Sequence, residues 1–494
     1  MSKYPHIKQD FLASLVVFLV ALPLCVGVAV ASGVPAELGL VTGIVGGLVT
    51  GVMRGSSLQV SGPAAGLTVL VFEAVSEFGL AVLAVMVLVT GLLQILMGTL
   101  GLGRWFRAIS VSVVEGMLAG IGLVLIAGQV YAIVDAKAPA SGLEKIAGVP
   151  AALADTFGDT GALASLALGA GTIAVLVLWR HLPGRVRAVP GPLAGVGLAT
   201  LAAVVLDLPV ATVEVHGLFD SVQLPSAGAL GELADPGVLA TVVAFTMIAS
   251  AESLFSAAAV DRLHSGPRTE YDRELVAQGA GNTVSGLLGA LPLTAVIVRS
   301  AANVQAGART KASRVMHGVW LLLFAAMLPQ ALALIPLPAL AGILIHAGAK
   351  LIPVRAIVPL WRDHRGEAVI LAVTALAIVM VSMFEGVLIG LGLAVVKTAW
   401  EASSVRTEVV DKGAGPIQVH LSGNATFLRL PKVLDRLEAL PEERPVELDL
   451  SGLHHLDHAF RTALEGWSER HGETSAEPVK VTAAGSEPAR AAAP

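Results

Sequence analysis

Charged side chains are scarce in this 494-residue sequence, and cysteine is almost absent. Only 14% of the residues are charged, against about 25% in a typical globular chain. This composition excludes an ordinary soluble protein. A formal net charge of −5 is small and gives no basic surface, so nucleic acid is not expected as a partner. Cys25 is the single cysteine, which excludes an internal disulfide framework.

Motifs for nucleotide or metal chemistry are also lacking. No P-loop occurs, so the chain carries no ATPase of its own. His454, His455 and His458 lie close together but lack a fourth ligand at a convincing spacing, which favours surface histidines over a zinc site. The sequence therefore predicts no enzyme, no cofactor and no metal.

Hydrophobic residues make up 55% of the chain. Apolar runs near the length of about 20 residues that crosses a bilayer recur from Phe11 to Trp400. The first run, 11–31, is too long for the apolar part of a signal peptide. We predict an all-α polytopic membrane protein with about 14 spans, arranged as two inverted repeats of seven at about 9–207 and 236–404. The predicted spans are 11–31, 37–53, 62–76, 79–101, 110–134, 162–180, 188–207, 236–258, 274–291, 293–306, 312–328, 330–350, 366–384 and 386–403.

The third span of each half is short and interrupted by glycine or proline, at 61–68 and 290–295. Paired interruptions at corresponding positions are typical of discontinuous helices that form a transport site. A half-helix that begins inside the membrane directs free N–H groups and a positive dipole end into the protein, which suits an anion. The alternative is a pair of kinks with packing roles only. The expected anion-binding residues are Gly62, Pro63, Ala64, Ala65, Thr294, Ala295, Val296 and Arg299.

Glu252 lies inside an apolar run of the eighth predicted span. A charge at that depth costs about 2.5–3.5 kcal/mol on insertion scales, so a carboxylate that is kept there is a functional candidate. Near an anion it would be repelled, and H⁺ or Na⁺ would relieve the repulsion and couple the two ions. Ser256 lies one turn further on the same face and is the second expected cation-coupling residue. The alternative is a structural ion pair between Glu252 and Arg299.

Basic residues predict the orientation. Loops after even-numbered spans carry most of the Lys and Arg residues, among them Arg54, Arg262, Arg268, Arg309 and Arg355. The long loop at 208–235 is acidic and has neither Lys nor Arg. By the positive-inside rule both termini are expected in the cytoplasm.

After Trp400 the sequence becomes polar and charged. Strand-like and helix-like runs alternate there, which predicts a small α/β domain over 405–484 beside a transmembrane domain over 1–404. The last stretch, 485–494, is rich in Ala and Pro and is expected to be disordered.

Several motifs, in order, resemble the SulP (sulfate permease) family of anion transporters, which contains bacterial relatives of prestin and pendrin. They lie at 10–23, 60–68, 252–261, 273–282 and 298–310. The tail at 446–457 resembles a short STAS domain, although His458 and Ala459 follow Asp457 where phosphorylatable STAS domains have serines.

The resemblance implies seven plus seven spans in a core and a gate, in a bacterial plasma membrane, with the anion between spans 3 and 10. It also implies that Glu252 and Ser256 lie at the cation position, and that Arg299 aligns with an arginine of the anion site. Na⁺-dependent relatives have Asp and Thr at the cation position, so Glu and Ser favour a proton at least equally.

We therefore expect a secondary active anion transporter, with a small anion, a coupling H⁺ or Na⁺ and the lipid bilayer as partners. The first expectation is H⁺-coupled symport of a dicarboxylate such as fumarate, or of a small inorganic anion. Na⁺-dependent symport of bicarbonate or sulfate is the first alternative, and an uncoupled anion channel or exchanger is the second. A sensor whose C-terminal tail signals membrane transport is an alternative of another class. A homodimer is compatible with the sequence.

Overall fold

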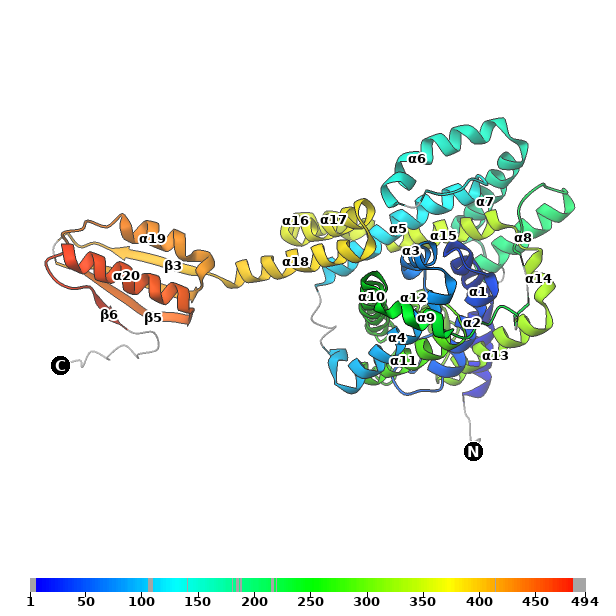
Figure 1. Cartoon of the computed structure of the whole chain (residues 1–494), viewed down its shortest axis with the longest axis horizontal. Coiled ribbons are helices and arrows are strands. Elements are labelled where there is room, and N and C mark those ends of the chain that lie inside the picture. Colours follow the sequence, from blue (N-terminus) through cyan, green and yellow to red (C-terminus); the bar gives the residue numbers. More distant parts are fainter. Residues whose placement is uncertain are drawn as a thin grey trace. The chain divides into compact units, whose positions relative to one another are not determined.

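The computed structural model describes residues 6–482 except 105–109, 140, 180, 184–185, 187–188, 215–216, 219 and 414. The chain divides into two compact units, Met1–Leu391 and Gly392–Pro494. Figure 1 shows the many helices of the first unit and the strands of the second. The predicted disordered stretch 485–494 lies outside the described residues.

The first half of the helical unit contains one short strand, β1 (Ser61–Pro63), which lies between two helices. A 3-10 turn at Ala65–Leu67 follows β1 and leads into α3. The helices are α1 (Ile7–Ala31), α2 (Ala36–Val45, continued by a π-helical turn at Gly46–Thr50), α3 (Thr68–Phe78), α4 (Leu80–Thr99), α5 (Val111–Ile133), α6 (Gly142–Asp155), α7 (Thr160–Trp179) and α8 (Gly191–Val205).

The second half repeats this pattern, with one short strand, β2 (Leu293–Ala295), directly before a short helix. Its helices are α9 (Ala227–Gly231), α10 (Pro236–Val260), α11 (Tyr271–Leu287), α12 (Ile297–Gln305), α13 (Ala312–Met327), α14 (Pro329–Ala333), α15 (Leu337–Leu351), α16 (Val354–Asp363), α17 (Arg365–Met380) and α18 (Met383–Ala402).

The prediction of a mainly helical membrane protein agrees with this architecture, and a helix lies in each of the fourteen predicted ranges. Within the described residues, six helical stretches are long and apolar enough to cross a bilayer: α1, α4, α5, α7, α10 and Leu337–Asp363, which joins α15 and α16. The count of fourteen spans stays a prediction. Three described helices of the helical unit lie outside the predicted ranges: the short α9 in the loop before α10, and the longer α6 and α16. Helices α6 and α16 follow the fifth and the twelfth predicted spans and so occupy corresponding places in the two halves.

Glycines let α4 and α11 lie in direct backbone contact. A Cβ atom on Gly279 would lie 2.7 Å from the carbonyl oxygen of Gly91, and one on Gly98 would lie 2.7 Å from that of Asp272. Both distances are too short for a carbon atom, so only glycine permits this packing. Small residues at such contacts are how membrane helices gain van der Waals energy where the hydrophobic effect offers little. This close packing holds α11 in place beneath the two short strands.

The second unit is a small α/β domain. Its sheet has the order β3-β4-β5-β6, with β3 (Val405–Val410) antiparallel to β4 (Ile417–Ala425). β4 is parallel to β5 (Val446–Leu456), and β5 is parallel to β6 (Lys480–Thr482). Parallel neighbours need crossover connections, which α19 (Leu430–Glu438) and α20 (His458–Thr474) supply. The predicted alternation of strands and helices is thus present, whereas the STAS assignment and the predicted domain limits stay proposals.

We expect a chain that ends at Ser404 to fold and insert. The α/β domain has its own apolar core, which includes Val419, Phe460 and Trp467, and the division between the two units falls within α18. Detergent size-exclusion chromatography of the membrane fraction should give one symmetric peak for the shortened chain. Loss of all inserted protein would show that the two units do not fold independently.

Candidate functional site

The two interrupted helices meet through their short strands. β1 and β2 pair antiparallel, with Gly62 opposite Thr294 and Ser61 opposite Ala295. The N–H of Val296 donates to the carbonyl oxygen of Val60 at 2.9 Å, which extends the ladder by one bond. Every residue of the two strands is buried. Since α3 and α12 leave opposite ends of a three-residue ladder, about 10 Å of strand separates their first turns.

This arrangement brings together the predicted anion-binding residues of the two halves. Pro63, Ala64 and Ala65 lead from β1 to the first turn of α3, and Val296 joins β2 to α12. The first N–H groups of a helix have no partner within the helix, and the macrodipole adds about half a positive charge there. Two such ends in one buried region create a positive potential without an exposed basic side chain.

Glu252 extends from α10 to the turn that starts α3. A Cβ atom on Gly66 would lie 2.8 Å from Glu252 Oε1, so the carboxylate is in contact with this turn and leaves no room for a side chain there. The Thr294 side chain lies beside it. Glu252 Oε2 and Thr294 Oγ1 are both buried and have no hydrogen-bond partner among the described residues. A buried carboxylate oxygen without a donor is costly, and a proton or a cation would reduce that cost.

Arg299 lies on α12 and is 1% exposed. Its Nη2 donates to the carbonyl oxygen of Pro63 at 3.3 Å, and its Nη1 lies where a side chain on Gly62 would be. Nε and Nη1 are buried without a partner in the described structure. The guanidinium therefore has donors free for an acceptor that the protein itself does not provide.

Two buried side chains that the sequence analysis did not assign to the site adjoin Arg299. They are Cys25 of α1, which lies against the guanidinium, and His317 of α13, which is fully buried. Neither ring nitrogen of His317 has a hydrogen-bond partner within the described residues. Neither a thiol nor an imidazole supplies a negative charge to pair with the guanidinium. Nothing in the local sequence around 25 or 317 indicates this proximity.

The alternative of a structural ion pair is not seen. No ion pair of the described residues joins Glu252 to Arg299. Ser256, the other predicted cation-coupling residue, is 1% exposed on α10. No described hydrogen bond links it to Glu252, so its role stays a prediction. The carboxylate and the guanidinium are therefore both without a charged partner in a buried setting.

Helix α11 holds both strands in register through a polar pair one turn apart. Gln278 Nε2 donates to Ser61 Oγ of β1 at 2.8 Å. Asn282 binds Leu293 of β2 on both sides: its Oδ1 accepts from the Leu293 N–H at 2.7 Å, and its Nδ2 donates to the Leu293 carbonyl at 3.1 Å. The Asn282 amide also donates to Gln94 Oε1 at 2.7 Å. Gln94 of α4 is thus an interhelical hydrogen-bond partner of α11.

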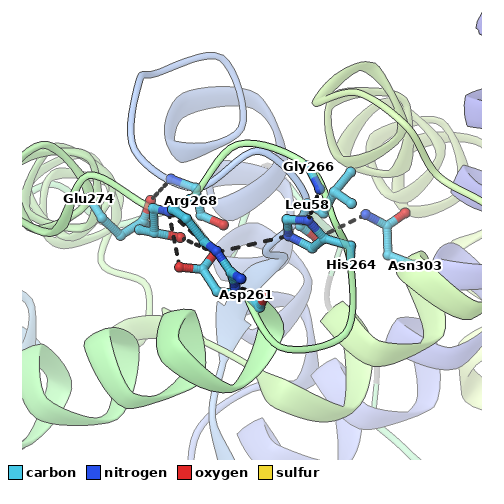
Figure 2. Close-up of polar contacts among 9 residues, drawn as sticks. Leu58, Asp261, His264, Gly266, Arg268, Glu274 and Asn303 are labelled. Carbon is cyan, nitrogen blue, oxygen red and sulfur yellow. Dashed lines mark hydrogen bonds and ion pairs between the residues drawn. The ribbon is translucent and has the colours of Figure 1, made fainter.

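The loop that precedes β1 is held from three sides. Arg314 donates to the carbonyl oxygens of Gly51, Gln59 and Met53. Figure 2 shows the neighbouring contacts, where Glu274 accepts from the N–H of Ser56 at 2.7 Å. In the same loop, the Leu58 carbonyl accepts from Asn303 Nδ2 of α12 at 2.9 Å.

Figure 2 also shows how the turn after α10 is closed. The Asp261 carboxylate accepts from Thr269, and Arg268 donates to the Asp261 carbonyl. These bonds fix the ends of the elements that carry Glu252 and Ser61.

Comparison with known proteins gives one consistent result. Residues 7–374 match the model of the Sulfate permease family. YvdB of Bacillus subtilis (strain 168), which its name marks as a candidate sulfate transporter, is 28% identical over 395 residues, 79% of this chain and 73% of the relative. The bicarbonate transporter BicA of Picosynechococcus is 25% identical over 425 residues, 82% of this chain and 73% of the relative.

A solved structure shares the fold of nearly the whole chain. It is that of the murine Solute Carrier 26 family member A9 anion transporter in the inward-facing state. The TM-score is 0.79 at 16% identity, and the match covers 97% of this chain and 86% of that one. At this identity the likeness speaks for the fold alone.

Proposed function

Because the chain belongs to the sulfate permease family, as the match over residues 7–374 shows, we propose that it is a secondary active transporter that carries a small anion together with a proton. The coarser part of this statement, a membrane-embedded anion transporter, follows from the family. The anion, the coupling ion and the residues that bind them are the proposal. One observation supports it most: Arg299 and Glu252 are enclosed near the starts of α3 and α12, and each has polar atoms that lack a partner among the described residues.

The anion would bind between the first turns of α3 and α12. Backbone N–H groups of two helix ends and the free donors of Arg299 suit an oxyanion, which accepts several hydrogen bonds at once. Gly62, Pro63, Ala64, Ala65, Thr294, Ala295 and Val296 would form the backbone frame. Such a site selects an anion by its size and charge. The candidate substrates are therefore sulfate and bicarbonate, which appear in the names of the relatives, and a dicarboxylate such as fumarate.

Glu252 would be the coupling group. An anion at the start of α3 would repel its ionised carboxylate, which lies against Gly66. Protonation removes that repulsion and lets proton and anion occupy the protein together. Na⁺ is the second candidate, because Ser256 stands one turn beyond Glu252 and its hydroxyl could share a cation with the carboxylate. We also propose that the chain lies in a bacterial plasma membrane with both termini in the cytoplasm, as the basic loops favour.

Uptake into liposomes tests the function. Purified protein should accumulate at least one of sulfate, bicarbonate and fumarate when the outside is made more acidic than the lumen, without a Na⁺ gradient. Uptake that responds to a Na⁺ gradient and not to a pH gradient would show that the coupling ion is Na⁺ and not H⁺. A current that reverses at the anion's equilibrium potential whatever the ion gradients would show an uncoupled channel.

Changing Arg299 to Gln should weaken anion binding by roughly 10- to 150-fold, because a hydrogen bond to a charged group contributes about 1.5–3 kcal/mol. The concentration dependence of anion exchange measures this. Arg299→Lys keeps the charge, so its anion affinity should lie between those of the parent and of Arg299→Gln. Arg273→Gln, which removes an exposed arginine paired with Glu270, is the control and should match the parent. Equal affinities for Arg299→Gln and the parent would remove Arg299 from the site.

A further inference from the structure

Helix α16 is an amphipathic segment whose outer face is not covered by other described parts of the protein. It follows α15 after a break at Ile352 and Pro353, where the backbone leaves the helical conformation. Its ten residues, Val354–Asp363, pack along α17, and none of them is fully buried. In Figure 1 α16 is labelled beside α17. A helix without a buried residue gains little from the protein interior, so its stability depends on another environment.

The faces of α16 differ in chemistry. Ala356 and Leu360, one turn apart, are the partly buried apolar positions. The other apolar side chains lie outward: Val358 is 74% exposed and Trp361 55% exposed, and Val354 and Ile357 share their side of the helix. Positions 354, 357, 358 and 361 follow the i, i+3, i+4, i+7 spacing of one continuous stripe. The helix thus presents a large apolar stripe away from the protein.

Positive charge borders this stripe. Arg355 and Arg362 are seven residues apart, so they lie on one edge of the helix, about 10 Å from each other along its axis. Both are exposed, and neither forms an ion pair with any described residue. Lys350 at the end of α15 and Arg365 at the start of α17 lie nearby in the chain. Asp363 is the only acidic residue in this stretch.

An apolar stripe with basic residues at its edge and a tryptophan at its end is the pattern of a helix that lies in the bilayer surface. The position in the chain agrees, because α15 and α17 are apolar helices of the membrane unit and α16 connects them at one bilayer surface. The first half places α6 at the corresponding point, also with a proline inside the helix.

We propose that α16 lies in the headgroup layer of the membrane. Val354, Ile357, Val358 and Trp361 would insert at the boundary of the acyl chains. Arg355 and Arg362 would bind the phosphates of anionic lipids. The surface is thus a docking site for an anionic bilayer, and the charge supplies the preference for acidic over zwitterionic headgroups.

Spin labels on introduced cysteines test the placement in the full-length protein. Cys25 is the only native cysteine and is fully buried, so the unsubstituted protein serves as the labelling control. In liposomes of phosphatidylcholine and phosphatidylglycerol, labels at Val358→Cys and Trp361→Cys should collide with oxygen, which dissolves in lipid. A label at Asp363→Cys, on another face, should collide with a water-soluble nickel chelate. The reverse pattern would overturn the proposal.

The charge is tested with the label at position 358. Adding phosphatidylglycerol to phosphatidylcholine liposomes should increase its contact with oxygen and decrease its contact with nickel. One arginine near an anionic surface contributes about a fivefold preference for anionic over zwitterionic lipid. The double variant Arg355→Gln, Arg362→Gln should therefore lose a preference on the order of thirtyfold. Its label should no longer respond to added phosphatidylglycerol. Arg461→Gln, on an exposed arginine of α20, is the matched control and should respond as the parent does.

Three further outcomes would also contradict the proposal. Spin–spin broadening between identical labels would place a second copy of the chain on α16. A label at 358 that is immobilised in the full chain, but mobile when residues after 404 are removed, would place the α/β domain there. A response to phosphatidylglycerol that persists in the double variant would remove the two arginines from lipid binding.

Discussion

Replacing Glu252 with Gln should abolish uphill anion uptake driven by a pH gradient while exchange of anion for anion continues. A gradient of one pH unit is worth about 1.4 kcal/mol, so coupling to one proton supports up to about tenfold accumulation in the parent. Glutamine resembles the protonated carboxylate but cannot release a proton. The internal anion concentration should therefore stop at the external one.

Two companion variants make this result specific. Glu252→Asp keeps a titratable group and should keep a response to the gradient. Glu115→Gln removes a carboxylate from α5 that is not among the proposed site residues, and this variant should accumulate anion as the parent does. Size-exclusion chromatography in detergent must first show one folded species for each protein. A folded Glu252→Gln protein that still concentrates anion in response to pH would exclude Glu252 as the coupling group.

The structure also changes what this variant means for stability. Had Glu252 paired with Arg299, its removal would have left a buried charge and cost about 3–5 kcal/mol. No such pair exists in the described residues, so Glu252→Gln and Glu252→Ala should both fold. The Ala variant should lose more stability, because it leaves a cavity beside Gly66.

Replacing Asn282 with Leu should have the largest effect on folding. The side chain is fully buried and makes three hydrogen bonds, two to Leu293 of β2 and one to Gln94. Leucine has a similar volume but leaves those partners unsatisfied, at about 1–3 kcal/mol each. We expect the free energy of unfolding to fall by roughly 3–9 kcal/mol, which is comparable to the whole stability margin of many proteins.

Unfolding of the purified protein in mixed micelles with increasing denaturing detergent measures this loss. Asn282→Asp keeps the acceptor for the Leu293 N–H and loses both donors, so it should lie between leucine and the parent. Asn424→Leu removes one exposed hydrogen bond, to the Ala402 carbonyl, and is the control for the substitution itself. An Asn282→Leu protein as stable as the Asn424→Leu protein would show that α11 does not hold the strands.

Local features of the sequence were sufficient for the broad architecture. The apolar runs, their breaks at Pro63 and Pro292, and the carboxylate at Glu252 are all read within one helix length. The reason is that crossing a bilayer requires each segment to satisfy its own backbone hydrogen bonds. A span, its interruption and a buried charge within it can therefore be recognised from the neighbouring residues in the sequence. After Trp400 the residues become polar and charged, and the first strand of the sheet, β3, begins at Val405.

Contacts between distant residues were decided by the tertiary structure alone. Gln278 meets Ser61 across 217 positions of the chain, and Arg299 lies beside Cys25 and His317 instead of Glu252. Helices α6 and α16 were missed because their short amphipathic patterns resemble loops when only long apolar runs are sought. The sequence determined which segments form apolar helices and where two of them are interrupted. Which buried polar groups meet, and which are left without a partner, depends on how the two halves pack, and no local pattern encodes that packing.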